Sequence, residues 1–175
     1  STKTPNDILV LCNLFYELVS SNILFSNLYA KLYKDLISKS DNLSKIIHKN
    51  IELVRDKIDN INYIDPDIDY DNFCENNKIN EKKRAEFTFF SNLMKYSIVS
   101  CDKIYNIIEY LFLKLDSYIQ EDNKKNQLDE LSELIYILIV NSLNIVKENN
   151  NDNYNIIVNN IKKFANMKVK TTPGI

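Results

Sequence analysis

Four aspartates at alternate positions are the residues in this chain whose spacing most suggests chemistry. They lie in the stretch NYIDPDIDYDNFCENN and are Asp65, Asp67, Asp69 and Asp71. Counted from Asp65, they fall at positions one, three, five and seven of an EF-hand calcium loop. That loop needs Gly at position six and Glu at position twelve, where this chain has Tyr70 and Asn76. Counting from Asp67 instead places Lys78 at position twelve. The pattern favours a solvated acidic loop, or an acidic contact for a basic partner, over a calcium site.

A basic cluster follows the acidic loop and consists of Lys82, Lys83 and Arg84. We expect it in the first turn of the next helix, where the helix dipole disfavours cations. Its position indicates either a contact with a partner or a plain solvated turn. Reversing all three charges is expected to leave the fold intact. Together with the aspartates, these cations and Asn92 and Lys95 of the same helix are the candidate partner-binding residues.

The sequence offers no recognisable phosphate-binding, metal-binding or catalytic motif. The one glycine is Gly174, so Gly-rich phosphate loops are excluded from the rest of the chain. His48 and the cysteines Cys12, Cys74 and Cys101 show no metal-ligand spacing. No paired carboxylates and no nucleophile beside a base are recognisable. We therefore predict no enzyme activity, no cofactor and no metal.

The composition adds limits on partners and compartment. A net charge of −2 argues against strong non-specific attraction for nucleic acid. Three scattered thiols indicate a reducing compartment, which we expect to be the cytoplasm. No apolar run is long enough to span a bilayer, and no signal peptide is recognisable, so no membrane partner is expected. Heavy use of Asn, Ile, Lys and Tyr is typical of an AT-rich genome.

The helix that must position the cluster spans Glu81 to Val99. Its apolar residues form two stripes that together sweep roughly 200° of the helix. They are Phe87, Phe90, Met94 and Ile98, and then Phe89, Leu93 and Tyr96. The pattern predicts a central helix packed on two sides. The remaining polar strip, expected to face solvent or a partner, holds Arg84, Thr88, Ser91, Asn92 and Lys95.

Helical periodicity recurs along residues 1–175, and no segment alternates with period two, so we predict a single all-α domain. Helix pairs beginning near Asp7, Leu43 and Ser100 give a repeat of roughly 40 residues, as in HEAT repeats. We predict a HEAT-like helical-repeat solenoid of about seven antiparallel helices, with an irregular helical bundle as the alternative. We also expect the last helix to leave Ile157, Ile161 and Phe164 as an apolar face prone to self-association.

The order of pieces resembles the middle domain of eukaryotic translation initiation factor 4G. That family has a helix of the type LxFEKAI and then FSxxYAxxCxxL; this chain has LCNLFYELVSSN and FSNLYAKLYKDL. The family's FRKLLLNRCQKEFE corresponds to LSKIIHKNIELVRD, and RRxxxNIxFIGELFK to KKRAEFTFFSNLMK, after an acidic variable loop in both. Its final N-x-I-x-K helix, before KTSSRIRF, corresponds to NNIKKFANMKVKTTPGI. The family's Gly-Glu is replaced by Ser91-Asn92 and its Asn by Glu86.

The resemblance implies a scaffold that binds and activates a DEAD-box RNA helicase of the initiation factor 4A type, with weak contact to mRNA. It also implies that a cap-binding protein binds through sequence outside this segment, and that the chain is an excised segment of a longer scaffold. The source would be a protist or a large DNA virus with an AT-rich genome. Related middle domains act in splicing, mRNA decay and nuclear cap binding, and the sequence separates them poorly.

A viral Bcl-2-like inhibitor, which binds an amphipathic helix in a groove, is the alternative from a different class. That fold uses an N-W-G-R type motif at a helix start. This chain has no Trp and no internal Gly.

Overall fold

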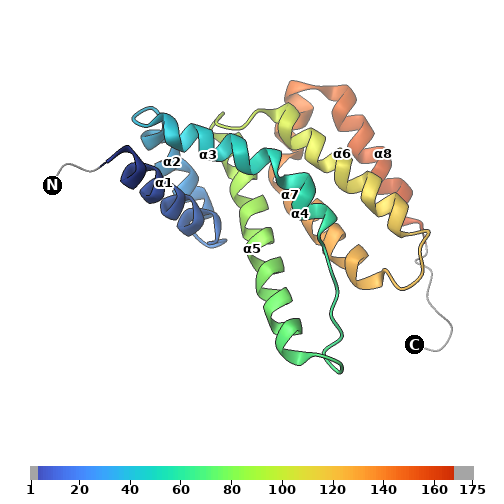
Figure 1. Cartoon of the computed structure of the whole chain (residues 1–175). Coiled ribbons are helices and arrows are strands. Elements are labelled where there is room, and N and C mark those ends of the chain that lie inside the picture. The colour runs from blue at the N-terminus through green and yellow to red at the C-terminus, as the bar shows by residue number, and fades with distance from the viewer. Residues whose placement is uncertain (1–3, 168–175) are drawn as a thin grey trace.

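The computed structural model describes residues 4–167, which form eight α-helices and no β-strand (Figure 1). The helices are α1 (Pro5–Ser20), α2 (Ser26–Ile37), α3 (Asp41–Glu52), α4 (Val54–Asp59), α5 (Tyr70–Lys95), α6 (Cys101–Tyr118), α7 (Lys125–Asn149) and α8 (Asn151–Ala165). The prediction of an all-α fold is therefore confirmed. The end of the segment NNIKKFANMKVKTTPGI, from residue 168 on, lies outside the described residues. No helix in residues 4–167 combines the length and apolarity needed to cross a membrane.

Side chains at the helix starts explain several boundaries. Thr4 and Asp7 form a reciprocal capping box at the start of α1, which satisfies backbone N–H groups that have no partner within the helix. The Ser100 hydroxyl accepts a hydrogen bond from the Lys103 N–H at the start of α6, as expected from its position. Asn150 caps α8 in the same way.

Residues 4–167 form eight helices where about seven were expected, because the helix expected to begin near Leu43 is broken. Residues 41–59 form α3 and the short α4, which meet at Leu53. The central helix also begins earlier than expected, at Tyr70 instead of near Glu81. The Asp69 carboxylate accepts a hydrogen bond from the Asn72 N–H and so caps α5 at that point. The second half of the acidic stretch is therefore helical.

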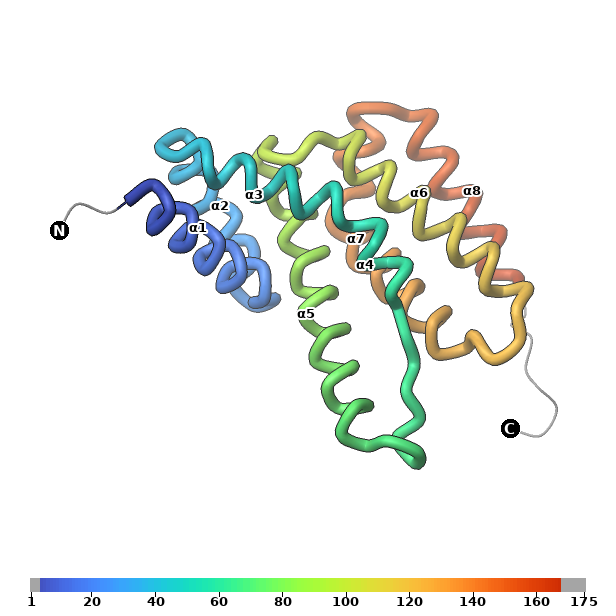
Figure 2. The backbone as a smooth tube through the Cα atoms, in the orientation of Figure 1, coloured from blue at the N-terminus to red at the C-terminus, as the bar shows by residue number. Residues whose placement is uncertain are grey.

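Helix α5 lies between the two halves of the chain. It packs against α1 and α2 on one side and against α6 and α7 on the other, and α8 packs on both α6 and α7. Its amino-terminal half extends beyond these neighbours, and residues 60–69 run alongside it (Figure 2). The Asn76 amide donates a 3.0 Å hydrogen bond to the Asn62 carbonyl and joins this loop to the helix.

The apolar stripes are buried as predicted from Phe87 to Met94, whereas Tyr96 and Ile98, just after the end of α5, are only partly buried. Phe87, Phe89, Phe90 and Leu93 have no exposed surface. Phe89 makes edge-to-face contacts with Tyr33 of α2, at 5.8 Å between ring centroids, and with Tyr16 of α1, at 6.3 Å. Such contacts add to the apolar surface that the rings bury. Aromatic side chains of α5 thus join the first two helices to the core.

The expectation that the polar strip of α5 faces solvent or a partner is wrong for Ser91 and Asn92. Both residues are buried. The Asn92 amide donates a 2.9 Å hydrogen bond to the Ser26 hydroxyl of α2, and the Ser91 hydroxyl donates to the Phe87 carbonyl one turn earlier. Most buried polar side chains in folded proteins are hydrogen-bonded in this way. Helix α5 is therefore covered on every side along residues 89–94.

The expected apolar face at the carboxyl-terminal end is present only in part. Ile157 is buried, and the Phe164 ring stacks on Phe112 of α6 with 5.7 Å between centroids, because α8 packs on both α6 and α7. Ile161 is exposed, as expected. Exposed large apolar side chains are more numerous on α1 and α2.

Candidate functional site

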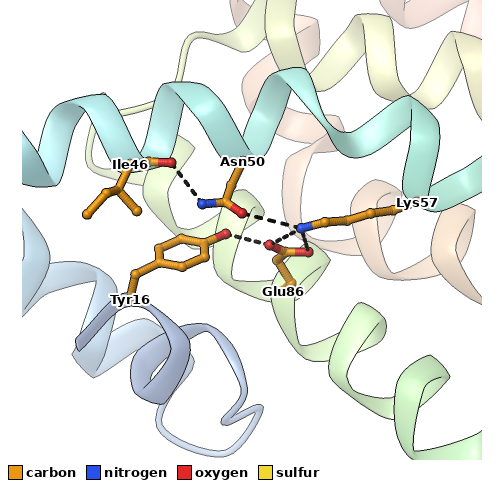
Figure 3. A network of polar contacts seen from close by, with 5 residues as sticks. All are labelled: Tyr16, Ile46, Asn50, Lys57 and Glu86. Carbon is orange, nitrogen blue, oxygen red and sulfur yellow. Dashed lines mark hydrogen bonds and ion pairs between the residues drawn. The ribbon is translucent and has the colours of Figure 1, made fainter. Parts of the chain in front are cut away.

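A buried polar cluster joins three helices through Tyr16 of α1, Lys57 of α4 and Glu86 of α5 (Figure 3). The Lys57 ammonium lies 2.6 Å from each carboxylate oxygen of Glu86. The Tyr16 hydroxyl donates a hydrogen bond to the same carboxylate. Asn50 of α3 extends the cluster, since its amide donates to the Ile46 carbonyl and its oxygen lies 3.5 Å from the Lys57 ammonium.

Helix geometry and burial explain the form of this cluster. Tyr16 shares the buried face of α1 with Cys12 and Val19. Burial, followed by the negative charge of Glu86, raises the pKa of Tyr16 far above its usual value, so the phenol remains a hydrogen-bond donor. The Glu86 carboxylate accepts from both partners and is only slightly exposed. It therefore acts as a link between helices and is poorly placed to act as a base.

An open groove of about 720 Å³ lies over this cluster. One wall is α1, with Leu14 and Leu18, and the other is α5, with Ile79, Lys82 and Lys83. Tyr16, Lys57 and Glu86 are among its lining residues. The groove combines aliphatic walls with a few charged groups, which is the composition of a binding site for a protein segment or a small molecule.

Lysines outnumber carboxylates in the groove. Lys57, Lys82 and Lys83 line it, against Glu17 and Glu86, although the whole chain has a net charge of −2. Lys83 is buried, and this burial lowers its pKa. Its ammonium lies 3.4 Å from the Asn80 side-chain oxygen. Lys82 is exposed and is the cation of the groove best placed for a partner.

The predicted basic cluster does not form one surface. Lys82, Lys83 and Arg84 lie in the middle of α5 and not in its first turn, because the helix begins at Tyr70. Successive residues are turned by about 100°, so Lys82 faces the groove while Arg84 faces α7. There Arg84 makes a two-point ion pair with Glu130, which raises the arginine's pKa. The burial of Lys83 and the pairing of Arg84 correct the expectation that reversing all three leaves the fold intact.

The two other candidate partner-binding residues on α5, Asn92 and Lys95, lie in different environments. Asn92 is buried against Ser26, so its predicted availability to a partner is wrong. Lys95 is exposed and donates hydrogen bonds to the side-chain oxygens of Asn92 and Asn141. It lies at the junction of α5 and α7.

The four aspartates have two kinds of position. Asp67 and Asp71 are exposed, whereas Asp65 and Asp69 are partly buried. The Asp65 carboxylate accepts from the Asp67 N–H at 2.9 Å and holds the loop in a turn. The cap that Asp69 forms with the Asn72 N–H lowers the pKa of Asp69. Within residues 4–167, no three His, Cys, Asp or Glu side chains are grouped so that they could hold a metal ion.

The acidic end of α5 and Lys82 are too far apart to screen each other. A helical rise of 1.5 Å per residue places Asp69 and Lys82 about 20 Å apart along α5. Charges in water are largely screened beyond about 8 Å at physiological ionic strength. The acidic loop and the groove are therefore separate electrostatic features.

Comparison with known proteins gives no relative: no protein-family model, curated protein or solved structure matches this chain. The family resemblance described above therefore supports a proposal only. The sequence singled out Lys82 and Lys83, but it missed the role of Tyr16, Lys57 and Glu86. A glutamate between Ala85 and Phe87 was the available signal, because a charge next to a buried stripe needs a partner.

Proposed function

We propose that this chain is a scaffold that binds a DEAD-box RNA helicase of the initiation factor 4A type and touches mRNA weakly. In this proposal the antiparallel helix pairs form a HEAT-like solenoid, and a cap-binding protein binds to sequence outside this segment in the cytoplasm. The related scaffolds of splicing, mRNA decay and nuclear cap binding are the alternatives. The collinear order of family-like pieces along the chain is the main support.

The geometry of α5 is the observation that best supports a binding role. Asp71 lies in its exposed first turn and Asp67 in the loop just before it, and the groove farther along presents Lys82 beside Leu14 and Leu18. These are two separated charged features, one at the start of the helix and one along it. A partner with two lobes of different surface charge would be fixed in orientation by such an arrangement, because charge complementarity sets register and encounter rate.

The side chains with unusual environments favour binding over catalysis. Glu86 is held by Lys57 and Tyr16, and Arg84 is held by Glu130. We therefore propose that the chain itself turns over no ATP and cleaves no RNA. ATP turnover by a preparation free of helicase would contradict this part of the proposal.

The helicase proposal is tested by binding kinetics with a purified DEAD-box helicase. We expect Lys82→Glu to slow association at low salt, and the difference from the unmodified chain to shrink at high salt. Lys162→Glu on α8 is the matched control, since Lys162 is also an exposed helical lysine but lies outside the groove. Failure of the unmodified chain to bind would reject the helicase proposal. Equal effects of both reversals would remove the groove from the interface.

The apolar walls of the groove give the Bcl-2-like alternative one supporting observation, because Leu14 and Leu18 could contact an amphipathic helix. A labelled death-domain helix separates the two functions. Binding of that helix without binding of the helicase would favour the alternative.

A further inference from the structure

We infer that two copies of this chain pair through the exposed apolar face of α1 and α2. The face shares Leu14 and Leu18 with the groove of the proposed helicase contact, but dimerisation is tested without the helicase and does not depend on that proposal. Eleven large apolar side chains of residues 8–32 are exposed by 40% or more. They are Ile8, Leu9, Val10, Leu11, Leu14, Leu18, Ile23, Leu24, Phe25, Leu28 and Leu32. Scattered exposed leucines are normal, but a concentration of this kind indicates an interface.

The spacing of these residues is that of a helix–helix seam. On α1, Leu11, Leu14 and Leu18 are separated by three and then four residues, and each is at least half exposed. Phe25, Leu28 and Leu32 repeat the same spacing at the start of and along α2. Alternation of three and four places side chains in one row that can interdigitate with a row on a facing helix. Each of the two adjacent helices, α1 and α2, thus carries one row of exposed apolar side chains that can pack against another helix.

The size of the face fits a dimer. Ile8, Leu9 and Val10 lie outside the row of Leu11 on α1, because successive residues are turned by about 100°. About 100 Å² of apolar surface per large side chain, roughly 60% exposed in the eight other residues, gives on the order of 500 Å². Homodimer interfaces are about 65% apolar. The face therefore corresponds to about 750 Å² on each partner, close to the roughly 800 Å² per partner of a standard stable interface.

The charges of the two helices favour a second copy as the occupant. The charged residues of α1 are Asp7 and Glu17, both acidic, whereas α2 has Lys31 and Lys34 against Asp35. A two-fold axis can place α1 of one copy on α2 of the other, which brings an acidic helix onto a net basic one. The face is then complementary to itself, as an isologous interface requires, and the two helical hairpins form a four-helix arrangement.

Sedimentation velocity of the 175-residue chain between about 1 and 100 µM tests this inference. We expect a monomer–dimer equilibrium, and a shift to monomer at every concentration in the double variant Leu14→Glu/Leu28→Glu. The control is Leu113→Glu, because Leu113 is 64% exposed on α6 and outside this face. We expect that control to dimerise as the unmodified chain does.

Several outcomes would overturn the inference. An unmodified chain that is monomeric at 100 µM removes the dimer. Species that grow beyond two copies remove the closed two-fold pairing. Loss of the dimer in Leu113→Glu, with its helical circular dichroism unchanged, removes the assignment to α1 and α2. If the double variant fails to fold, the single variants Leu14→Gln and Leu28→Gln must each weaken the dimer at least tenfold for the inference to stand.

Discussion

The ammonium of Lys57 lies 2.6 Å from both carboxylate oxygens of Glu86, so that a residue of the short helix α4 is fixed to the centre of α5. The two residues are 29 positions apart in the chain. Between them the chain leaves α4, runs along α5 through residues 60–69 and returns as α5 itself. This ion pair therefore joins the two ends of that segment and helps to hold residues 60–69 beside α5.

We expect Glu86→Ala to lower the free energy of unfolding by about 2 to 4 kcal/mol, because the partly buried Lys57 ammonium and the buried Tyr16 phenol both lose their carboxylate acceptor. The double variant Glu86→Leu/Lys57→Met should recover part of this loss, since no charge is then left unpaired. Urea unfolding of Glu86→Leu, of Lys57→Met and of the double variant gives the coupling energy between the two side chains. Strictly additive losses would show that the two side chains do not stabilise each other.

Alkaline pH should destabilise the protein through Tyr16. Its pKa is raised in the folded state, whereas an unfolded tyrosine titrates near 10. Below about pH 9 both states keep the proton and stability is unaffected. Above about pH 10 the unfolded chain loses the proton first, so the free energy of unfolding falls, by at most about 1.4 kcal/mol per pH unit for one group. Tyr16→Phe should show a shallower fall between pH 10 and 11.5. Tyr136→Phe, at an exposed site, is the control, and an equal slope in both would contradict the prediction.

The three adjacent cations of α5 should respond differently to charge reversal. Arg84→Glu places two carboxylates face to face at Glu130 and should lower the melting temperature by about 4 to 10 °C. Lys83→Glu should also destabilise, because the site is buried. Lys82→Glu should change stability by less than about 0.5 kcal/mol. Thermal unfolding followed by circular dichroism distinguishes the three, and equal effects would mean that their environments do not differ as described.

Phe90→Ala should remove about 3 to 5 kcal/mol, since the ring is fully buried and neighbours Phe87 at 6.3 Å between centroids. Single domains have only about 5 to 15 kcal/mol in total, so this variant should be close to unfolding. Leu113→Ala is the matched exposed control and should melt within a few degrees of the unmodified chain. A mild effect of Phe90→Ala would show that α5 is not the centre of the core.

Local patterns predicted most helices and the aromatic stripes of α5, because caps and apolar spacing are properties of neighbouring residues. A helix begins next to Ser100 as expected, with the Ser100 hydroxyl as its cap, and Phe87, Phe89 and Phe90 are buried. The early start of α5 was missed because we assigned the aspartates to a loop, whereas Asp69 supplies a helix cap. The break at Leu53 has no Gly or Pro to signal it.

The polar strip could not be predicted from α5 alone. Arg84, Asn92 and Glu86 look alike in the sequence as polar residues beside apolar ones. Each is paired with a side chain distant in the chain, by 46, 66 and 70 residues for Glu130, Ser26 and Tyr16. A helical pattern shows which residues share a face, but not whether that face meets water or a partner of opposite polarity. The site is therefore a property of the tertiary structure.

The position of α5 between both halves of the chain has a consequence for how the protein folds. Arrays of repeats can unfold one unit at a time, because each unit contacts only its neighbours. Here α5 contacts α1 and α2 as well as α6 and α7, so the loss of either pair of helices exposes apolar surface of the same helix to water. We expect unfolding in a single cooperative transition. The backbone amides around Phe90 should then exchange with solvent only when the whole domain opens.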